Sequence, residues 1–501
     1  MLSYRKLAMR VLGRPLHTGG NDSPRPASQR AAAFILTAAM LTTLAAPAFA
    51  KTWHIEDGDI TVKAGDTKGT NKVSQGESTD VPDTDTVITN REKNASSNTV
   101  TIETNDKNDK VEVTLKDVNI DTSSRNKAAV SVTGEGDTNI KLDGDNALKS
   151  DIYRSGIYGS GSGSLTISGG TVTANGDDGG RGISSSGSVT ISGGSTVTAN
   201  GGNGTISGGD GICSNGGVTI SGGSTVTVNG GNGGSLVGGD GIRSGGGLTV
   251  SDGTVTAKGG NGDSKDGYGG DGIRSGGVIT ISGNTVNAAG GYGGKVGGYG
   301  ICSFDRVAIS GGTVEAAGGN GSTGGGSGIY SSVIDLSGSL ELTAKAGSPN
   351  GKALLQAGHE LDLDTIKDKL GPGAKVTVTD ADGKVNQVSI PRPVEPEEPV
   401  IPEESSSSSD GGSATPSTPA SPLPGLTVTD KSGAVISYTS TQSGNTLTVC
   451  VGRFTASLRA SLSALRQLRA EGIETITFQT ILCSTTLSVD ELLAMGGEDA
   501  E

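Results

Sequence analysis

The chain has 501 residues, enough for two or three domains, and 86 of them are glycine, far above average usage. Aromatic side chains are scarce (one Trp, five Phe and eight Tyr), which excludes a globular core built on large side chains. The formal net charge is −14, and residues 1–50 carry +5, so the remainder carries −19. This acidic balance argues against nucleic acid and anionic membranes as partners, and it suits either divalent cations or simple solubility.

Residues 1–50 are predicted to be a signal peptide. Basic residues precede an apolar stretch from Ala31 to Ala46, and Ala48-Phe49-Ala50 is a small-x-small cleavage site. The mature chain would begin at Lys51 and be secreted, or stay associated with the cell surface. An uncleaved membrane anchor is the alternative. No second long apolar run follows, so we expect no membrane span in the mature chain.

Residues 51–150 carry period-2 patterns without a glycine repeat, for example KVEVTLKDVNID and TNIKLDG. Asp, Asn and Gly separate these runs, so they predict short strands joined by turns. We interpret them as the irregular first coils and N-terminal cap of a solenoid. A cap is expected because an uncovered end of such a solenoid is an open sheet edge.

Residues 151–390 contain the repeat and its C-terminal cap. Three apolar columns recur with one period, and the steps between the isoleucines of the first column are 26, 29, 30, 31, 28 and 28 residues. The first column follows a glycine in a G-I pair: Ile157, Ile183, Ile212, Ile242, Ile273, Ile301 and Ile329. The second is Ile167, Ile191, Ile220, Val250, Ile281 and Ile309, and the third is Val172, Val197, Val226, Val255, Val286 and Val314. Phased columns of this kind are typical of a stacked repeat fold.

Each repeat holds three short alternating runs, GIRS, LTVS and TVTA in the copy that begins at Gly241, separated by glycine turns. Alternation predicts strands with one buried face, and glycine supplies the corners. The prediction is an all-β right-handed parallel β-helix with coils about 4.8 Å apart. Five small aliphatic side chains per coil do not offset the entropy of ordering the coil, so polar ladders or ions must also contribute. A column of Asn residues in the glycine-rich loops suits a ladder or turn, with ligand contact as the alternative.

Two further polar columns are candidates for function. Asp210, Asp240 and Asp271 stand one coil apart, each two residues before a column isoleucine, and Arg243 and Arg274 also repeat. Stacked carboxylates repel one another unless a cation or base pairs with them. Calcium, which prefers six to eight oxygen ligands, is the predicted cofactor, and simple pairing with the arginines is the alternative.

Four tyrosines gather late in the repeat: Tyr268, Tyr292, Tyr299 and Tyr330. Aromatic rings on a surface of small residues can stack on sugar faces. We predict that these tyrosines, with Arg243 and Arg274, contact carbohydrate. Packing within the loops is the alternative.

Residues 391–425, rich in Pro, Glu and Ser, are predicted to be a disordered linker. Residues 426–501 predict a small α+β domain in which SLRASLSALRQLRAEG forms a helix, with Leu458, Leu462, Leu465 and Leu468 at helical spacing. Cys450 and Cys483 lie in this domain and are candidates for a disulfide. Cys213 and Cys302 are too many coils apart to bond to each other.

No catalytic site is readable. Of three histidines, His17 leaves with the signal peptide, and His54 and His359 lie at opposite ends of the solenoid. Nucleophile–histidine constellations within the repeat are therefore excluded. A carboxylate pair from neighbouring coils stays open.

The run KVEVTLKDVNIDTSSRNKAAVSVTGEGDTNIKLDGDNALKS, followed by repeated GGDGIRS–LTVSDGTVTA units, resembles secreted bacterial carbohydrate-binding β-helix proteins, which are related in fold to pectate lyases. The resemblance covers roughly residues 55–350. It implies a non-catalytic right-handed β-helix, calcium sites made by loop aspartates, and binding of acidic or cellulosic plant polysaccharide. Asp210, Asp240 and Asp271 match the family's acid position, whereas Tyr299 and Ser327 occupy it in later coils.

The leading hypothesis is thus a secreted or surface-associated, non-catalytic protein that binds polysaccharide and is stabilised by calcium. A structural adhesin stalk that presents the C-terminal domain to another surface protein is the second hypothesis. A polysaccharide lyase, with Arg243 or Arg274 as the base, is the third.

Overall fold

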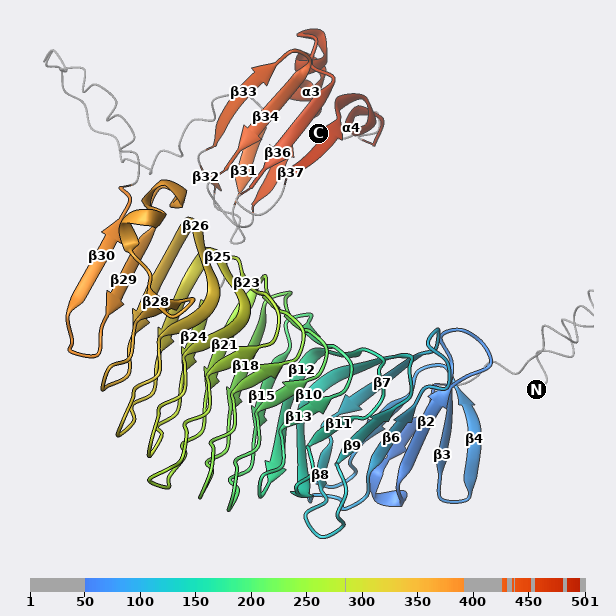
Figure 1. Ribbon diagram of the computed structural model, residues 1–501. Coiled ribbons are helices and arrows are strands. Elements are labelled where there is room, and N and C mark those ends of the chain that lie inside the picture. The colour runs from blue at the N-terminus through green and yellow to red at the C-terminus, as the bar shows by residue number, and fades with distance from the viewer. Residues whose placement is uncertain are drawn as a thin grey trace, which may run out of the picture. The chain divides into compact units, whose positions relative to one another are not determined.

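The computed structural model describes residues 50–283, 285–391, 426–429, 435–436, 438–451, 456–480 and 484–495 (Figure 1). The chain divides into one compact unit up to Pro396 and a second from Glu397 onward. The predicted signal peptide, apart from Ala50, and the predicted linker beyond Pro391 lie outside the described residues. No helix within these ranges is long and apolar enough to cross a membrane.

The first unit is the predicted right-handed parallel β-helix, with about 12 turns. Three parallel sheets run along it, and Figure 1 shows their strands stacked coil upon coil. The G-I face consists of β2 (Ile60–Ala64), β6 (Val100–Glu103), β9 (Val130–Thr133), β11 (Ile157–Gly159), β13 (Ile183–Ser185), β16 (Ile212–Ser214), β19 (Ile242–Ser244), β22 (Ile273–Ser275), the starts of β25 (Ile301–Ala317) and β26 (Ile329–Lys345), and β27 (Leu354–Gln356).

The other two faces follow the second and third apolar columns. The second face consists of β1 (Thr52–His54), β5 (Val87–Thr89), β7 (Lys110–Lys116), the first halves of β10 (Asp137–Ile152) and β12 (Leu165–Asp177), β14 (Val189–Ser192), β17 (Val218–Ile220), β20 (Leu248–Val250), β23 (Ile279–Ile281) and the middles of β25 and β26. The third consists of β8 (Asn119–Asp121), the second halves of β10 and β12, β15 (Thr196–Asn200), β18 (Ser224–Asn229), β21 (Gly253–Lys258), β24 (Thr285–Ala289), the ends of β25 and β26, and β29 (Lys375–Thr379).

The three predicted columns form the core. Every isoleucine and valine of these columns is fully buried. Each pairs with the residue at the same column position in the next coil, for example Ile242 with Ile273. This register follows from the period-2 alternation, because a slip of one residue would turn a column outward.

Both ends of the solenoid are covered. At the N-terminal end β3 (Asn71–Gln75) and β4 (Ser78–Asp83) extend β2 as antiparallel strands, beside the 3-10 turn η1 (Ile55–Asp57). At the C-terminal end lie β28 (His359–Glu360), the 3-10 helix η2 (Leu363–Lys369), and β30 (Val385–Ser389), which forms a hairpin with β29. These elements lie where the sequence predicts the caps.

The glycine-rich loops are ordered stacks. Their Asn column forms the predicted ladder, since the backbone N–H of Asn232 donates to Oδ1 of Asn203 (2.7 Å) and that of Asn261 to Oδ1 of Asn232 (2.8 Å). The two glycine-rich legs of each loop bond to each other and to the next coil, as from Gly239 N to Gly231 O (2.8 Å). A Cβ at Gly239 would lie 1.9 Å from Gly209 O, so these legs pack backbone against backbone.

The second unit is a small α+β domain. Within its described residues β31 (Leu426–Thr429) lies between β32 (Val435–Ile436) and β35 (Ser457–Ala460), and a second sheet has the order β33 (Thr439–Ser443), β34 (Thr446–Cys450), β36 (Thr475–Gln479) and β37 (Ser484–Ser488). Helices α3 (Leu462–Ala470) and α4 (Val489–Met495) complete it.

The prediction of a helix over SLRASLSALRQLRAEG was wrong at its N-terminal end, because the helix begins only at Leu462. Ser457–Ala460, with Leu458, pairs with β31 as a strand, so Leu458 does not belong to the helix. Ser461 ends the strand and caps the helix, because its hydroxyl accepts the N–H of Ala464. Leu465 and Leu468 are buried in the core of this domain as expected.

Candidate functional site

The aspartate column is tied to the backbone of the next coil. Oδ1 of Asp210 accepts the N–H of Asp240 (2.9 Å), Oδ1 of Asp240 accepts that of Asp271 (2.8 Å), and Oδ1 of Asp271 accepts that of Tyr299 (2.7 Å). All three aspartates are buried. The column is therefore a hydrogen-bonded ladder of the same kind as the Asn column.

The second oxygen of each carboxylate faces an arginine. Arg181 Nε donates to Asp210 Oδ2 (3.1 Å), Arg243 Nη1 lies 4.0 Å from Asp240 Oδ2, and Arg274 Nη1 lies 3.3 Å from Asp271 Oδ2. Arg181 occupies the position of the aspartates one coil earlier, in an R-G-I triplet in place of D-G-I. The column is thus closed by a cation at one end and by the Tyr299 amide at the other.

Burial perturbs two of these carboxyl groups. Burial raises the pKa of Asp240 well above its ordinary value, and the charges of Asp271 and Asp210 raise it further. Burial also raises the pKa of Asp271 to about 6, against the opposing effects of the Tyr299 N–H and Arg274. Both groups therefore hold a proton more tightly than an exposed aspartate.

The column as arranged does not fit a calcium ion. One oxygen of each carboxylate accepts an N–H and the other faces a guanidinium, so the aspartates do not converge on one point. Over the described residues there is no group of three or more His, Cys, Asp or Glu side chains that would hold a metal. The geometry corresponds to the arginine-pairing alternative, and calcium binding stays a prediction.

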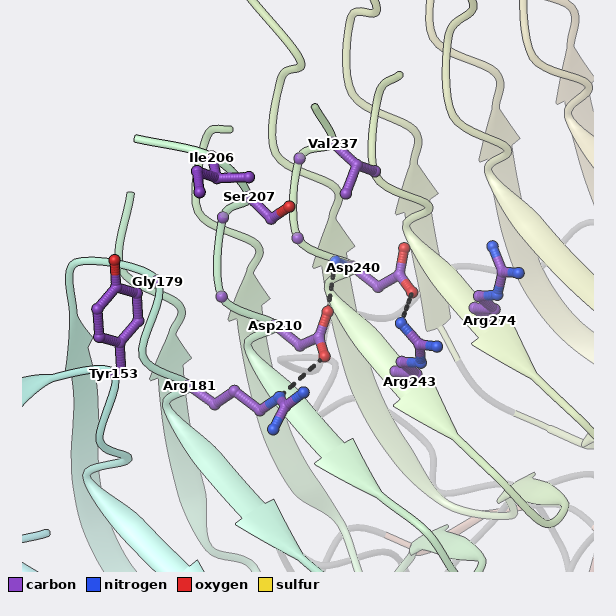
Figure 2. Close-up of a pocket in the computed structure, with 14 residues that line it drawn as sticks. Tyr153, Gly179, Arg181, Ile206, Ser207, Asp210, Val237, Asp240, Arg243 and Arg274 are labelled. Carbon is purple, nitrogen blue, oxygen red and sulfur yellow. Dashed lines mark hydrogen bonds and ion pairs between the residues drawn. The ribbon is translucent and has the colours of Figure 1, made fainter. Parts of the chain in front are cut away.

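A hollow of about 410 Å³ lies over this column (Figure 2). Tyr153, Ile206 and Val237 form its apolar side, and Ile206 and Tyr153 are among the most exposed large apolar residues. Its polar side is formed by Arg181, Asp210, Asp240, Arg243 and Arg274. Figure 2 shows the arginines along one side of the hollow and the loop residues Ile206, Ser207 and Val237 along the other.

A second hollow of about 530 Å³ adjoins the first, since Tyr153 and Arg181 line both. Lys127, Arg154 and Tyr158 line it together with threonine and serine side chains from β6 and β9. Arg154 Nε donates to Asn126 Oδ1 (3.0 Å), and no carboxylate of the described chain lies within ion-pair distance of Arg154. We call the two hollows together the side trough.

The predicted tyrosines divide into separate groups. Tyr299 and Tyr330 stack on each other with ring centroids 5.0 Å apart. Tyr268 and Tyr292 are exposed in the loops, and Lys295 Nζ lies 5.6 Å from the Tyr268 ring. None of the four is among the residues that line the side trough, so the structure does not join them with Arg243 and Arg274 in one hollow.

The cysteines face different surroundings. Cys213 and Cys302 are free and buried although they lie on the outer side of the G-I face. Burial and the nearby charge of Asp210 raise the pKa of Cys213 to about 11. The Cys450 thiol is free and donates to Gln479 Oε1 (3.5 Å), whereas Cys483 lies outside the described residues, so their predicted pairing stays a prediction.

Several residues of the side trough were not predicted: Lys127, Tyr153, Arg154, Tyr158 and Arg181. Two signals were available in the sequence. Arg181 replaces the column aspartate, and Tyr158 follows Ile157 at the position that Arg243 takes in a later coil. Lys127 and Arg154 precede β9 and β11 in coils whose turns do not follow the repeat, so their approach depends on the fold.

No protein family model, no curated protein and no solved structure matches the chain. The β-helix that the resemblance implies is present, and the carbohydrate binding that it implies stays a prediction. Because one fold serves many functions, the functional argument depends on the side trough itself.

Proposed function

We propose that this protein is a secreted or cell-surface, non-catalytic polysaccharide-binding β-helix that holds an acidic sugar chain in the side trough. The observation that carries the proposal is the meeting of an apolar wall with a row of cations in one elongated depression. Tyr153 contributes to both hollows, and Arg154 contributes a charge without a carboxylate partner among the described residues.

The lining has the amphipathic character that sugar recognition needs. Tyrosine rings and aliphatic side chains offer flat apolar surface to the C–H face of a pyranose, and each ring also carries a hydroxyl. Tyr153 and Tyr158 are exposed, so they are accessible to a ligand. Arginine adds a planar set of donors that matches a carboxylate.

The charges favour an acidic chain. Lys127, Arg154, Arg181, Arg243 and Arg274 line the trough of a protein whose formal net charge is −14. Asp210, Asp240 and Asp271 beside the arginines are buried, and Asp59 pairs with Lys127 (3.0 Å), so Arg154 is the cation of the trough that has no carboxylate partner among the described residues. A local positive row on an acidic protein attracts anionic ligands and directs them to this surface.

The length of the trough favours a polymer. Its lining extends from Thr101 on β6 to Arg274 on β22, across the successive strands β9, β11, β13, β16 and β19. At about 4.8 Å per coil this is roughly 29 Å. Several linked sugars fit such a length, whereas a monosaccharide would occupy only a part.

The proposal assigns no catalytic step and does not require calcium. Binding to polygalacturonate, to fully methyl-esterified pectin and to cellulose, measured by affinity electrophoresis and calorimetry with and without EDTA, tests it. We expect the acidic polymer to bind best, with an affinity that falls as salt is added. Formation of unsaturated, ultraviolet-absorbing product from polygalacturonate would instead identify a lyase.

Two exposed cations provide a matched pair of variants. Arg154→Gln removes a charge from the trough, and we expect it to weaken binding about fivefold, which corresponds to ~1 kcal/mol. Lys258→Gln removes a charge from an exposed side chain at the end of β21, on the third face, and should leave binding unchanged. Absence of binding to every glycan, or equal losses for both variants, would refute the proposal.

A second candidate function is an adhesin stalk, in which the solenoid is a spacer. It is favoured by one observation, the separate hydrophobic core of the C-terminal unit around Val449, Leu465 and Ile476. Affinity capture with residues 426–501 distinguishes the two functions. A surface protein captured by this domain, together with no glycan binding by the solenoid, would support the stalk.

A further inference from the structure

Asp83, at the end of β4, holds a buried carboxylate beside the first residues of the solenoid. The residue has no exposed surface. Its Oδ1 accepts the N–H groups of Lys51 (3.2 Å) and Asp85 (3.1 Å), and its Oδ2 accepts the indole N–H of Trp53 (2.8 Å). Three donors from two chain segments therefore meet at one acid.

This acid has no cationic side chain as a partner. No Lys, Arg or His nitrogen in the described part of the chain lies within 4.0 Å of the Asp83 carboxylate. The other three buried aspartates of the described residues each have an arginine within 4.0 Å: Asp210, Asp240 and Asp271. A buried carboxylate is costly without a countercharge, so the missing cation calls for an explanation.

The backbone nitrogen of Lys51 is the atom that would become charged on processing. The sequence predicts cleavage between Ala50 and Lys51, and both residues are exposed. Hydrolysis adds water across their amide bond, leaving a carboxylate on Ala50 and an amine on Lys51. That amine takes up a proton at neutral pH, because an α-amino group has a pKa of about 7.7–8.0.

We propose that removal of residues 1–50 completes the N-terminal end of the solenoid: the new α-ammonium of Lys51 forms an ion pair with the buried carboxylate of Asp83. Processing is then a stabilising modification and not only the loss of a leader. The ion pair holds β1 against β4 beside Trp53. The side-chain Nζ of Lys51 lies over the Trp53 ring, 3.7 Å from its centroid. This inference is independent of any ligand in the side trough.

Trp53 is the single tryptophan of the chain and is 2% exposed, so its fluorescence reports on this site alone. The test compares a chain that begins at Lys51 with one that begins at Ala48, each with Asp83 and with Asp83→Asn. We expect the chain from Lys51 to melt about 2 °C or more above the longer one, and Asp83→Asn to abolish the difference.

Titration of the two chains gives a readout that needs no substitution. Pairing raises the α-amino pKa in the folded state, so the stabilisation is fully present below about pH 7.7 and is lost as the pH rises through the higher folded value. The chain from Ala48 should not show this loss. Mass spectrometry of the exported protein should give Lys51 as the first residue. Equal melting temperatures at pH 7, an advantage that survives Asp83→Asn, or a different first residue would overturn the proposal.

Discussion

The backbone N–H of Asp240 donates to Oδ1 of Asp210 at 2.9 Å, so a side chain of one coil holds the backbone of the next. Asn232 and Asn203 repeat the arrangement in the glycine-rich loop at 2.7 Å. A solenoid with five small aliphatic side chains per coil needs such additional bonds between coils. Both columns therefore contribute to the fold whether or not a ligand binds near them.

The aspartate ladder depends on an acceptor oxygen and not on a negative charge. Asp240→Asn keeps an oxygen for the Asp271 N–H and removes repulsion within the column, so we expect a change in unfolding free energy below about 1 kcal/mol at pH 7. Asp240→Ala leaves that buried N–H without an acceptor and should cost about 1–3 kcal/mol. Urea unfolding followed by circular dichroism measures both, and equal losses would contradict the ladder.

The aspartate column also predicts a pH dependence. The folded pKa of Asp271 is about 6, above its ordinary value of 3.8, so the folded state binds the proton more tightly than the unfolded state. The resulting stabilisation is fully present below about pH 4 and is lost as the pH rises to about 6. We expect the free energy of unfolding to decrease across this window by on the order of 1–3 kcal/mol.

Asp271→Asn is the matched control for this pH effect and should make the decrease between pH 4 and 6 smaller, leaving the contribution of Asp240, whose pKa is also raised. Asp59 does not contribute to the pH dependence in this window. Burial would raise its pKa, but hydrogen bonds from Arg125 and Thr99 lower it to about 2, so Asp59 titrates at lower pH. An unchanged slope in Asp271→Asn would show that other groups titrate in this range.

The glycine legs of the loops exclude even one methyl group. A Cβ at Gly239 would meet Gly209 O at 1.9 Å, whereas a Cβ at Gly324, also in a loop, would have its nearest neighbour, a Val296 methyl, at 3.9 Å. We expect Gly239→Ala to destabilise by about 1–3 kcal/mol and Gly324→Ala to be nearly neutral. Thermal unfolding compares them, and similar effects would argue against backbone packing in the loops.

The thiol of Cys213 should be protected. With a pKa of about 11, it holds ~100-fold less thiolate at pH 8 than an ordinary cysteine, and it is buried. Alkylation by iodoacetamide at pH 8, followed by peptide mass spectrometry, should label Cys213 only after denaturation. Rapid labelling in the folded protein would contradict the described packing.

Much of the fold followed from local pattern. The G-I isoleucines and the two other columns have one period, and alternation assigns each neighbour to the core or to the surface, so coil, face and register were all predictable. The helix boundary at Ser461 was not, because Leu458 fits the helical spacing while pairing with β31 decides that it is a strand residue. The same competition between local spacing and tertiary pairing applies at most element ends.

By itself the sequence determined the all-β solenoid, its three apolar columns, the asparagine ladder and the position of the aspartate column, because each depends on one repeated interval. Only the tertiary structure decided where charges meet. Arg181 reaches Asp210, Tyr153 joins two hollows, and Lys51 meets Asp83 across 32 residues of chain. These contacts join different coils, or a coil and its cap. No repeated interval in the sequence predicts them, because they depend on where the irregular turns place each side chain relative to its neighbours.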